Sequence, residues 1–159
     1  RVLFRSWANH PNAIFYPEAH RLNHPMSPHA AADLDGVTLK AEDFALPTQD
    51  RNLVVELAGG LMVPLTHSYL NIDLIRDLGL PVVLVSRFYL GSINHSLLSA
   101  ALLKAHNIPV LGWIFNDEVN QASREVILEY SGWPSLLDVP FLEETTPEIV
   151  QQYAAKLKL

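Results

Sequence analysis

The stretch "PVVLVSRFYLGSINHSLLSAALLKAHNIPVLGWIFN", residues 81–116, decides the predicted fold because it contains two buried strands separated by a helix. Residues 81–86 and 109–116 are short apolar runs, typical of strands that are buried on both faces. Residues 92–107, between them, are predicted as a helix. A strand, a helix and a second strand in this order form a parallel pair. This stretch therefore predicts an α/β fold.

The alternation of strands and helices continues on both sides of this unit. Upstream, "NLVVE" (residues 52–56) is predicted as a buried strand, and residues 68–79 as an amphipathic helix closed by Gly79. Downstream we expect a helix at residues 120–132, a short strand at 135–140 and a terminal helix at 146–159. Near the start, Ser27 as N-cap and Pro28 at the first helical position predict a short helix. The prediction is an α/β domain with a mainly parallel sheet flanked by helices.

Composition and charge restrict the class of protein and its partners. The chain has 159 residues, 49% of them hydrophobic, which suits one globular domain with a sizeable core. A net charge of −6 without any Lys/Arg cluster argues against nucleic acid or an anionic membrane as the main partner. The lack of cysteine excludes disulfides and thiolate metal sites. No apolar run is long enough to span a bilayer and no signal peptide is visible, so we expect a cytoplasmic protein.

The beginning of the chain does not follow these patterns. It has no initiator Met, and residues 1–15 show no clear helical or strand period. The leading "RVLFRS", residues 1–6, resembles the translation of a sequencing-library adapter, although a frayed native segment is the alternative. We therefore expect a non-native leader at 1–6 and a single, incomplete α/β domain at 7–159.

Ligands of open parallel sheets collect at the carboxyl ends of the strands, where connecting loops leave a crevice. Four predicted loops there carry polar or glycine residues: Glu56 with Gly59 and Gly60, residues 86–94, Asn116 with Asp117, and residues 138–141. Because four such loops share one rim, we predict a binding site at this edge.

Two of these loops suggest specific chemistry, each with a structural alternative. The Glu56 carboxylate could hold Mg²⁺ beside nucleotide phosphates, or it could cap a turn. The N-terminal turn of the helix at 92–107, with Gly91, Ser92 and Asn94, could bind an anion, although Ser92 could serve only as the N-cap. For His95 a structural role is favoured.

Two classes of enzyme find little support in the sequence. His20, His24 and His29 lie in an irregular stretch without the helical spacing and carboxylates of a zinc site. No G-x-S-x-G motif and no cysteine supplies a nucleophile, which argues against a covalent hydrolase.

Four motifs together resemble the dethiobiotin synthetase family: "MSPHAAA" (26–32), "VVELAGGLMVPL" (54–65), "LGSINHSLLSA" (90–100) and "LGWIFND" (111–117). The resemblance covers nearly all of residues 13–142 and implies a P-loop NTPase-like fold. It also implies an ATP-dependent ring closure in the biotin pathway. One amine of 7,8-diaminononanoate captures CO₂ as a carbamate, ATP phosphorylates the carbamate, and the second amine closes the cyclic urea. ADP and phosphate leave, and Mg²⁺ assists through charge neutralisation.

The resemblance assigns roles to the loop at Glu56. Glu56 matches the acidic Mg²⁺ ligand, and Gly59 and Gly60 match the backbone segment that lies along the diamine and its carbamate. Leu57 stands where many members have glycine, so the turn after Glu56 is expected to have a different shape.

The resemblance also implies nucleotide and subunit contacts. Asn116 matches the residue that hydrogen-bonds the adenine edge, and Pro140 with Phe141 falls in the loop that encloses the base. Gly91 and Asn94 match a segment that reaches the substrate of the partner subunit in a homodimer.

One family motif, the phosphate-binding G-x-x-x-x-G-K-[ST] loop, does not occur in this sequence and is expected upstream of residue 1. We therefore expect the chain to be the C-terminal part of the enzyme and inactive alone. The strand leading into that loop would lie between the strands predicted at 52–56 and 81–86, so its loss would leave unpaired strand edges. Two alternatives remain: another P-loop amide-forming synthetase, and a non-catalytic P-loop relative that acts as a dimeric binding module. The string "SINH" (92–95) favours dethiobiotin synthetase over the first alternative. An intact phosphate loop in the upstream reading frame would favour an enzyme over the second.

Overall fold

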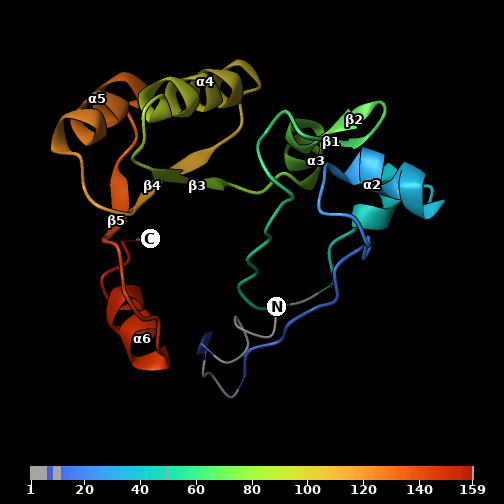
Figure 1. Cartoon of the computed structure of the whole chain (residues 1–159), viewed down its shortest axis with the longest axis horizontal. Coiled ribbons are helices and arrows are strands. Elements are labelled where there is room, and N and C mark those ends of the chain that lie inside the picture. Colours follow the sequence, from blue (N-terminus) through green and yellow to red (C-terminus); the bar gives the residue numbers. More distant parts are fainter. Residues whose placement is uncertain (1–6, 9–11, 49, 159) are drawn as a thin grey trace. The chain divides into compact units, whose positions relative to one another are not determined.

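The computed structural model describes residues 7–8, 12–48 and 50–158, and its elements are labelled in Figure 1. The predicted leader at 1–6 lies outside the described residues. The chain forms two compact units, one of Pro17–Leu80 and one of Arg1–Tyr16 with Pro81–Leu159. The single domain expected at 7–159 stays a prediction.

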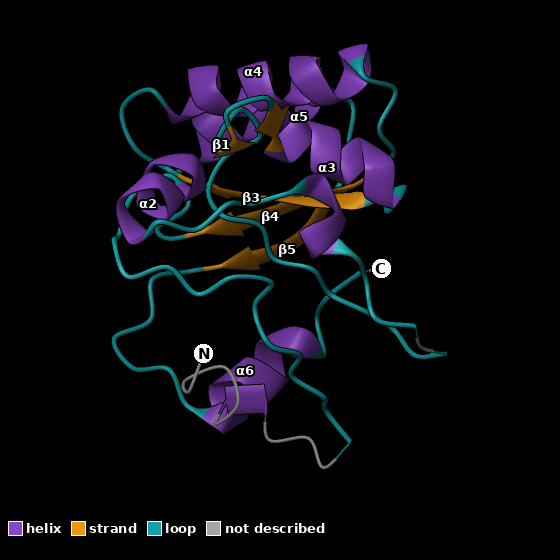
Figure 2. Cartoon of the chain, turned by 90° about the vertical axis from the view of Figure 1, so that its right-hand side faces the viewer, coloured by secondary structure: helices purple, strands orange, loops and turns teal. Residues whose placement is uncertain are grey.

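The larger unit contains a parallel three-stranded sheet of order β3-β4-β5, with β3 at Val82–Arg87, β4 at Val110–Asn116 and β5 at Ser135–Val139. Helices α4 (Ser92–Ala105) and α5 (Gln121–Ser131) cover one face of this sheet, as Figure 2 shows. Helix α6 (Pro147–Ala154) follows β5. These elements confirm the strands and helices predicted from residue 81 onward and the α/β class.

Aromatic side chains of β4 form the core between this sheet and its helices. Trp113 and Phe115 are each 1% exposed, and their rings stack at 6.0 Å between centroids. Ala100 of α4 and Ile127 of α5 pack against them. The Trp113 indole donates a hydrogen bond of 2.9 Å to the Ser131 hydroxyl, so this buried N–H is satisfied. Trp113 and Phe115 of β4 are therefore buried as predicted. The prediction that β3 is buried on both faces is wrong: Leu84 packs against this core, but Val85, the next residue, points to the opposite face and is 64% exposed.

Gly112 sets the distance between β4 and β5. A Cβ atom at this position would lie 2.5 Å from the Pro134 carbonyl oxygen and 2.9 Å from the Leu136 side chain. The next residue, Trp113, donates its backbone N–H to the same Pro134 carbonyl at 2.9 Å. Only glycine allows the two backbones to approach this closely.

The smaller unit combines short elements: α2 (Pro28–Asp35), the 3₁₀ helix η1 (Ala41–Phe44), β1 (Pro64–Thr66), β2 (Tyr69–Leu70) and α3 (Asn71–Leu78). Ser27 and Pro28 begin α2 as predicted, although the Ser27 side chain makes no cap hydrogen bond. Gly79 closes α3 in the left-handed conformation that suits glycine, also as predicted. Strands β1 and β2 form an antiparallel pair that the sequence did not predict.

The strand predicted at 52–56 is wrong, because residues 52–57 have no regular secondary structure. Val54 is 94% exposed, and none of the described strands pairs with this segment. An apolar run becomes a strand only where a neighbour accepts its backbone hydrogen bonds. Glu56 therefore does not follow a strand end.

Candidate functional site

The carboxyl ends of the three parallel strands bring part of the predicted site together. Arg87, at the end of β3, pairs with Asn116 of β4, and Asn116 pairs with Val139 of β5. Pro140 follows Val139 directly, so Asn116 and the loop of Pro140 and Phe141 end neighbouring strands. Asn116 is exposed and Phe141 is 66% exposed, which leaves both accessible to a ligand.

An ion pair lies beside Asn116 that the sequence did not indicate. Two guanidinium nitrogens of Arg87 donate to one carboxylate oxygen of Asp117, at 2.6 and 3.1 Å. These hydrogen bonds, with one from the Glu118 backbone N–H, hold the pKa of Asp117 below its ordinary value. Asp117 has a φ of 99° and donates its backbone N–H to the Val139 carbonyl. The pair joins the ends of β3 and β4 next to the predicted adenine contact.

A second pair supports the end of β5. Arg124 of α5 donates to both carboxylate oxygens of Asp138, at 3.1 and 3.0 Å. The Ser135 hydroxyl donates to the same carboxylate at 3.1 Å. The Arg124 guanidinium also lies 5.6 Å from the centre of the Phe115 ring. Asp138 is therefore engaged within the fold, and it orients the strand end that leads to Pro140.

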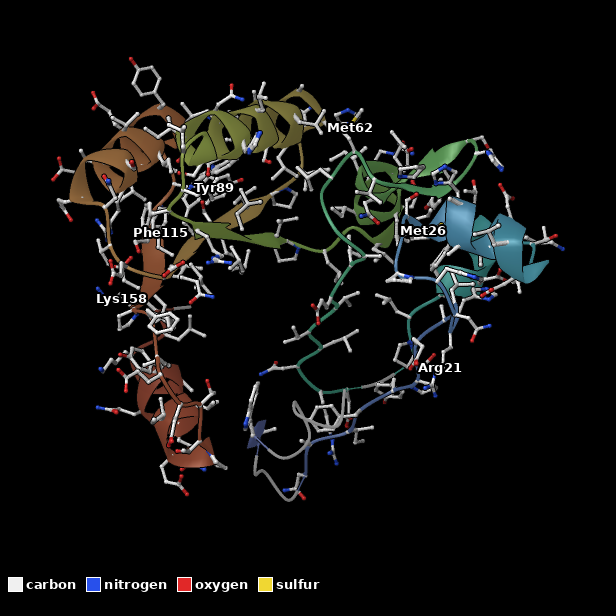
Figure 3. The ribbon with its side chains drawn as sticks, viewed as in Figure 1. Arg21, Met26, Met62, Tyr89, Phe115 and Lys158 are labelled. Carbon is white, nitrogen blue, oxygen red and sulfur yellow. The ribbon has the colours of Figure 1, made fainter. Side chains whose placement is uncertain are left out.

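The predicted anion site lies at the start of α4. Gly91 is the N-cap residue, with a φ of 99°, and Ser92 is the first helical residue, so Ser92 is not the N-cap. Asn94 is exposed on the first turn. The Tyr89 hydroxyl and His95 Nδ1 form a hydrogen bond of 2.7 Å, in agreement with a structural role for His95. Figure 3 labels Tyr89 at the end of β3.

An open hollow of about 560 Å³ lies beside this turn. It is lined by residues 88–93, which follow β3, and by polar and apolar residues that follow β4, among them Glu118 and Asn120. Of the predicted site residues, Gly91 lines this hollow, whereas Asn94 and Asn116 do not.

Glu56, Gly59 and Gly60 belong to the smaller unit, and all three are exposed. Gly59 adopts a φ of 84°, whereas Gly60 does not have a positive φ. Among the described residues, the Glu56 carboxylate makes no ion pair and is free to meet a cation. The expectation that Glu56 shares a rim with Asn116 stays a prediction.

Within residues 7–8, 12–48 and 50–158, no group of three or more acidic or histidine side chains could hold a metal ion. A single carboxylate fits Mg²⁺ only in the manner of nucleotide sites, where water and phosphate oxygens supply the remaining ligands. In the same described ranges, no helix has the length and apolar content needed to cross a membrane.

This chain is similar to known proteins of one class. A family model described as an AAA domain matches residues 1–149. Similar relatives are named ATP-dependent dethiobiotin synthetase BioD, and three illustrate the range. The protein of Rhodopseudomonas palustris (strain HaA2) is 48% identical over 141 residues, which are 89% of this chain and 66% of the relative. That of Cytophaga hutchinsonii is 44% identical over 147 residues, 92% of this chain and 71% of the relative. That of Brucella abortus (strain S19) is 42% identical over 132 residues, 83% of this chain and 62% of the relative.

The chain belongs to the dethiobiotin synthetase family. It spans about two thirds of the length of these relatives.

Proposed function

We propose that the full-length protein carrying this chain is an ATP-dependent cyclo-ligase that forms dethiobiotin from 7,8-diaminononanoate and CO₂. The observation that carries the proposal is the identity of 42–48% with three proteins of that name over 83–92% of the chain. The carbamate of one amine takes the γ-phosphoryl group of ATP. The second amine then attacks the carbamate carbon, the C–N bond closes the urea, and phosphate leaves. The cytoplasm is the proposed location.

The nucleotide is proposed to bind at the ends of β4 and β5. The Asn116 side chain is exposed and can offer both a donor and an acceptor to the adenine edge, and the exposed ring of Phe141 can cover the base. The Arg87–Asp117 pair beside Asn116 joins β3 to β4 and helps to hold Asn116 in place. This arrangement supports base recognition at that edge.

Glu56 is proposed to be the protein ligand of Mg²⁺. Its exposed carboxylate has no ion-pair partner in the described part of the chain, so its charge is available for a cation. When bound, the metal would neutralise charge on the ATP phosphates. Gly59 and Gly60 present backbone close to Glu56, and we propose that this backbone contacts the diamine and its carbamate.

A homodimer is proposed in which Gly91 and Asn94 contact the substrate held by the partner subunit. Both residues are exposed at the start of α4, and the adjacent Leu90 is fully exposed, which suits a surface covered by a second copy. A mixture of two inactive variants tests this arrangement. In a dimer of Glu56→Gln and Asn94→Ala subunits, one site would carry both changes and the other neither. Random mixing would then restore about a quarter of the parental activity. If the mixture regains no activity, Glu56 and Asn94 belong to the site of the same subunit.

The reaction itself is tested by incubating the full-length protein with 7,8-diaminononanoate, bicarbonate and Mg·ATP. We expect dethiobiotin, identified by mass, together with one ADP and one phosphate per product. Omission of the diamine should abolish most ADP release. ATP hydrolysis without dethiobiotin would contradict the proposed reaction.

A further inference from the structure

The turn that contains Gly59 and Gly60 is held by the first residues of α3. The Asn71 side-chain amide donates two hydrogen bonds of 2.9 Å, one to the Ala58 carbonyl and one to the Gly60 carbonyl. These carbonyls belong to the Ala58–Gly59 peptide and the Gly60–Leu61 peptide, so they lie on either side of the Gly59–Gly60 peptide. One amide group therefore holds the peptide plane that precedes Gly59, the residue with the positive φ, and the peptide plane that follows Gly60.

The backbone N–H groups of Asn71 and Ile72, the first two residues of α3, also bind this turn. The Asn71 N–H donates to the Val63 carbonyl at 3.0 Å, and the Ile72 N–H donates to the Leu61 carbonyl at 2.9 Å. Within the turn, the Val63 N–H donates to the Gly60 carbonyl at 3.0 Å. Figure 3 labels Met62, which lies in this turn and is 60% exposed. The start of α3 thus shapes the turn through these hydrogen bonds, whereas Gly59 and Gly60 stay exposed to solvent.

The chemistry of the site determines how the Asn71 amide is oriented. If the amide were rotated by 180°, its oxygen would face two carbonyl oxygens at 2.9 Å, which is repulsive. The NH₂ group must therefore face the turn. The Asn71 oxygen is then buried and, among the described residues, has no hydrogen-bond partner.

This unpaired oxygen shows that Asn71 is a poor choice for stability alone. The residue is fully buried, and an apolar side chain of similar volume would avoid the cost of an unsatisfied acceptor. The donors of the amide, in contrast, serve only the carbonyls of the turn. A buried polar group of this kind specifies one backbone conformation at a cost in stability.

We propose that Asn71 is a positioning residue that holds the Gly59–Gly60 turn in the conformation that receives the diamine carbamate. This inference rests on the proposed function. Among the described residues, the N–H groups of Gly59 and Gly60 donate no hydrogen bond, so they are available to an anionic oxygen such as that of a carbamate. The Gly59 N–H lies in the Ala58–Gly59 peptide, which Asn71 holds directly, and the Gly60 N–H lies in the next peptide, which the two held peptides enclose. Asn71 therefore controls the directions of these N–H groups without touching the substrate.

Asn71→Leu in the full-length protein is the sharpest test, since it keeps the volume and removes both donors. We expect kcat/KM for 7,8-diaminononanoate to fall about tenfold or more. A tenfold fall corresponds to the free energy of about one hydrogen bond between the turn and the substrate. The Kd of ATP should stay within about twofold. The urea midpoint should change little, because removal of the unpaired Asn71 oxygen offsets the loss of the donors to the two part-buried carbonyls. Asn71→Ala, which removes the same donors and leaves a cavity, should show the same kinetic change with a lower midpoint.

Ser131→Ala is the matched control, because it removes a buried hydrogen bond to Trp113 in the other unit. It should lower the urea midpoint without changing kcat/KM for the diamine. If Asn71→Leu has parental kinetics, or if diamine and ATP parameters fall together with stability, the proposal is overturned.

Hydrogen exchange separates this inference from the proposed reaction. In Asn71→Leu the Val63 and Ile72 amides should exchange faster than in the parent, whereas in Ser131→Ala they should not. If the parent forms no dethiobiotin, the proposed function fails, and unchanged exchange in Asn71→Leu would then refute the positioning role as well. Faster exchange would support Asn71 as the residue that holds the turn, whatever ligand the turn receives.

Discussion

Replacement of Gly112 by alanine tests the separation of β4 and β5, on which the proposed nucleotide site depends. The new Cβ would lie 2.5 Å from the Pro134 carbonyl oxygen and 2.9 Å from the Leu136 side chain. Since the closest neighbour is backbone, the strands must move apart. Overpacking of about 1–3 kcal/mol, with about 1 kcal/mol for the weakened hydrogen bond from Trp113 to Pro134, gives a loss of about 2–4 kcal/mol.

Urea unfolding of the full-length protein, followed by tryptophan fluorescence, measures this loss. With an m-value of about 2 kcal/mol/M, a loss of 3 kcal/mol moves the midpoint by about 1.5 M. Gly132→Ala is the control: Gly132 has a φ of 71° and open space around its Cα, so alanine there adds only backbone strain of about 1 kcal/mol. If Gly112→Ala costs no more than Gly132→Ala, the close approach of β4 and β5 is refuted.

Three further predictions concern the candidate site in the full-length protein. Asn116→Ala should weaken ATP binding by about 1–3 kcal/mol, since an adenine polar group loses its partner; equal affinity by calorimetry would remove Asn116 from the site. Glu56→Gln should preserve the circular dichroism spectrum but lower turnover at limiting Mg²⁺, and parental turnover there would make Glu56 a turn residue. Because Arg87 lowers the pKa of Asp117 below 3.8, the pair's contribution to stability is fully present above pH 3.8 and is lost as the pH falls through the folded-state pKa. Arg87→Met should therefore lower the urea midpoint at pH 7 more than at a pH below that pKa. An equal change of the midpoint at the two pH values would contradict the dependence of stability on the charge of Asp117.

The sequence by itself determined the parallel sheet, its helices and most of their ends. Short apolar runs predicted β3, β4 and β5, and Gly79 predicted the end of α3, because a buried strand and a left-handed helix end each depend on a few adjacent residues. The motifs also indicated the family to which the chain belongs. Asn116 and Pro140 could be assigned to the same edge of the sheet, since parallel strands end at one edge. That their strands are neighbours came from the structure.

Only the tertiary structure decided the features that join distant segments. Residues 52–56 have the composition of a buried strand, but a strand requires hydrogen-bond partners from another segment, and the described strands supply none. Arg87 and Asp117 are 30 residues apart and meet because β3 and β4 are neighbours in register. Asn71 shows no sign in the sequence of its role, because it lies near the start of an amphipathic pattern, where a polar residue is common. Its contacts with Ala58 and Gly60 arise only where the turn folds back onto the start of α3.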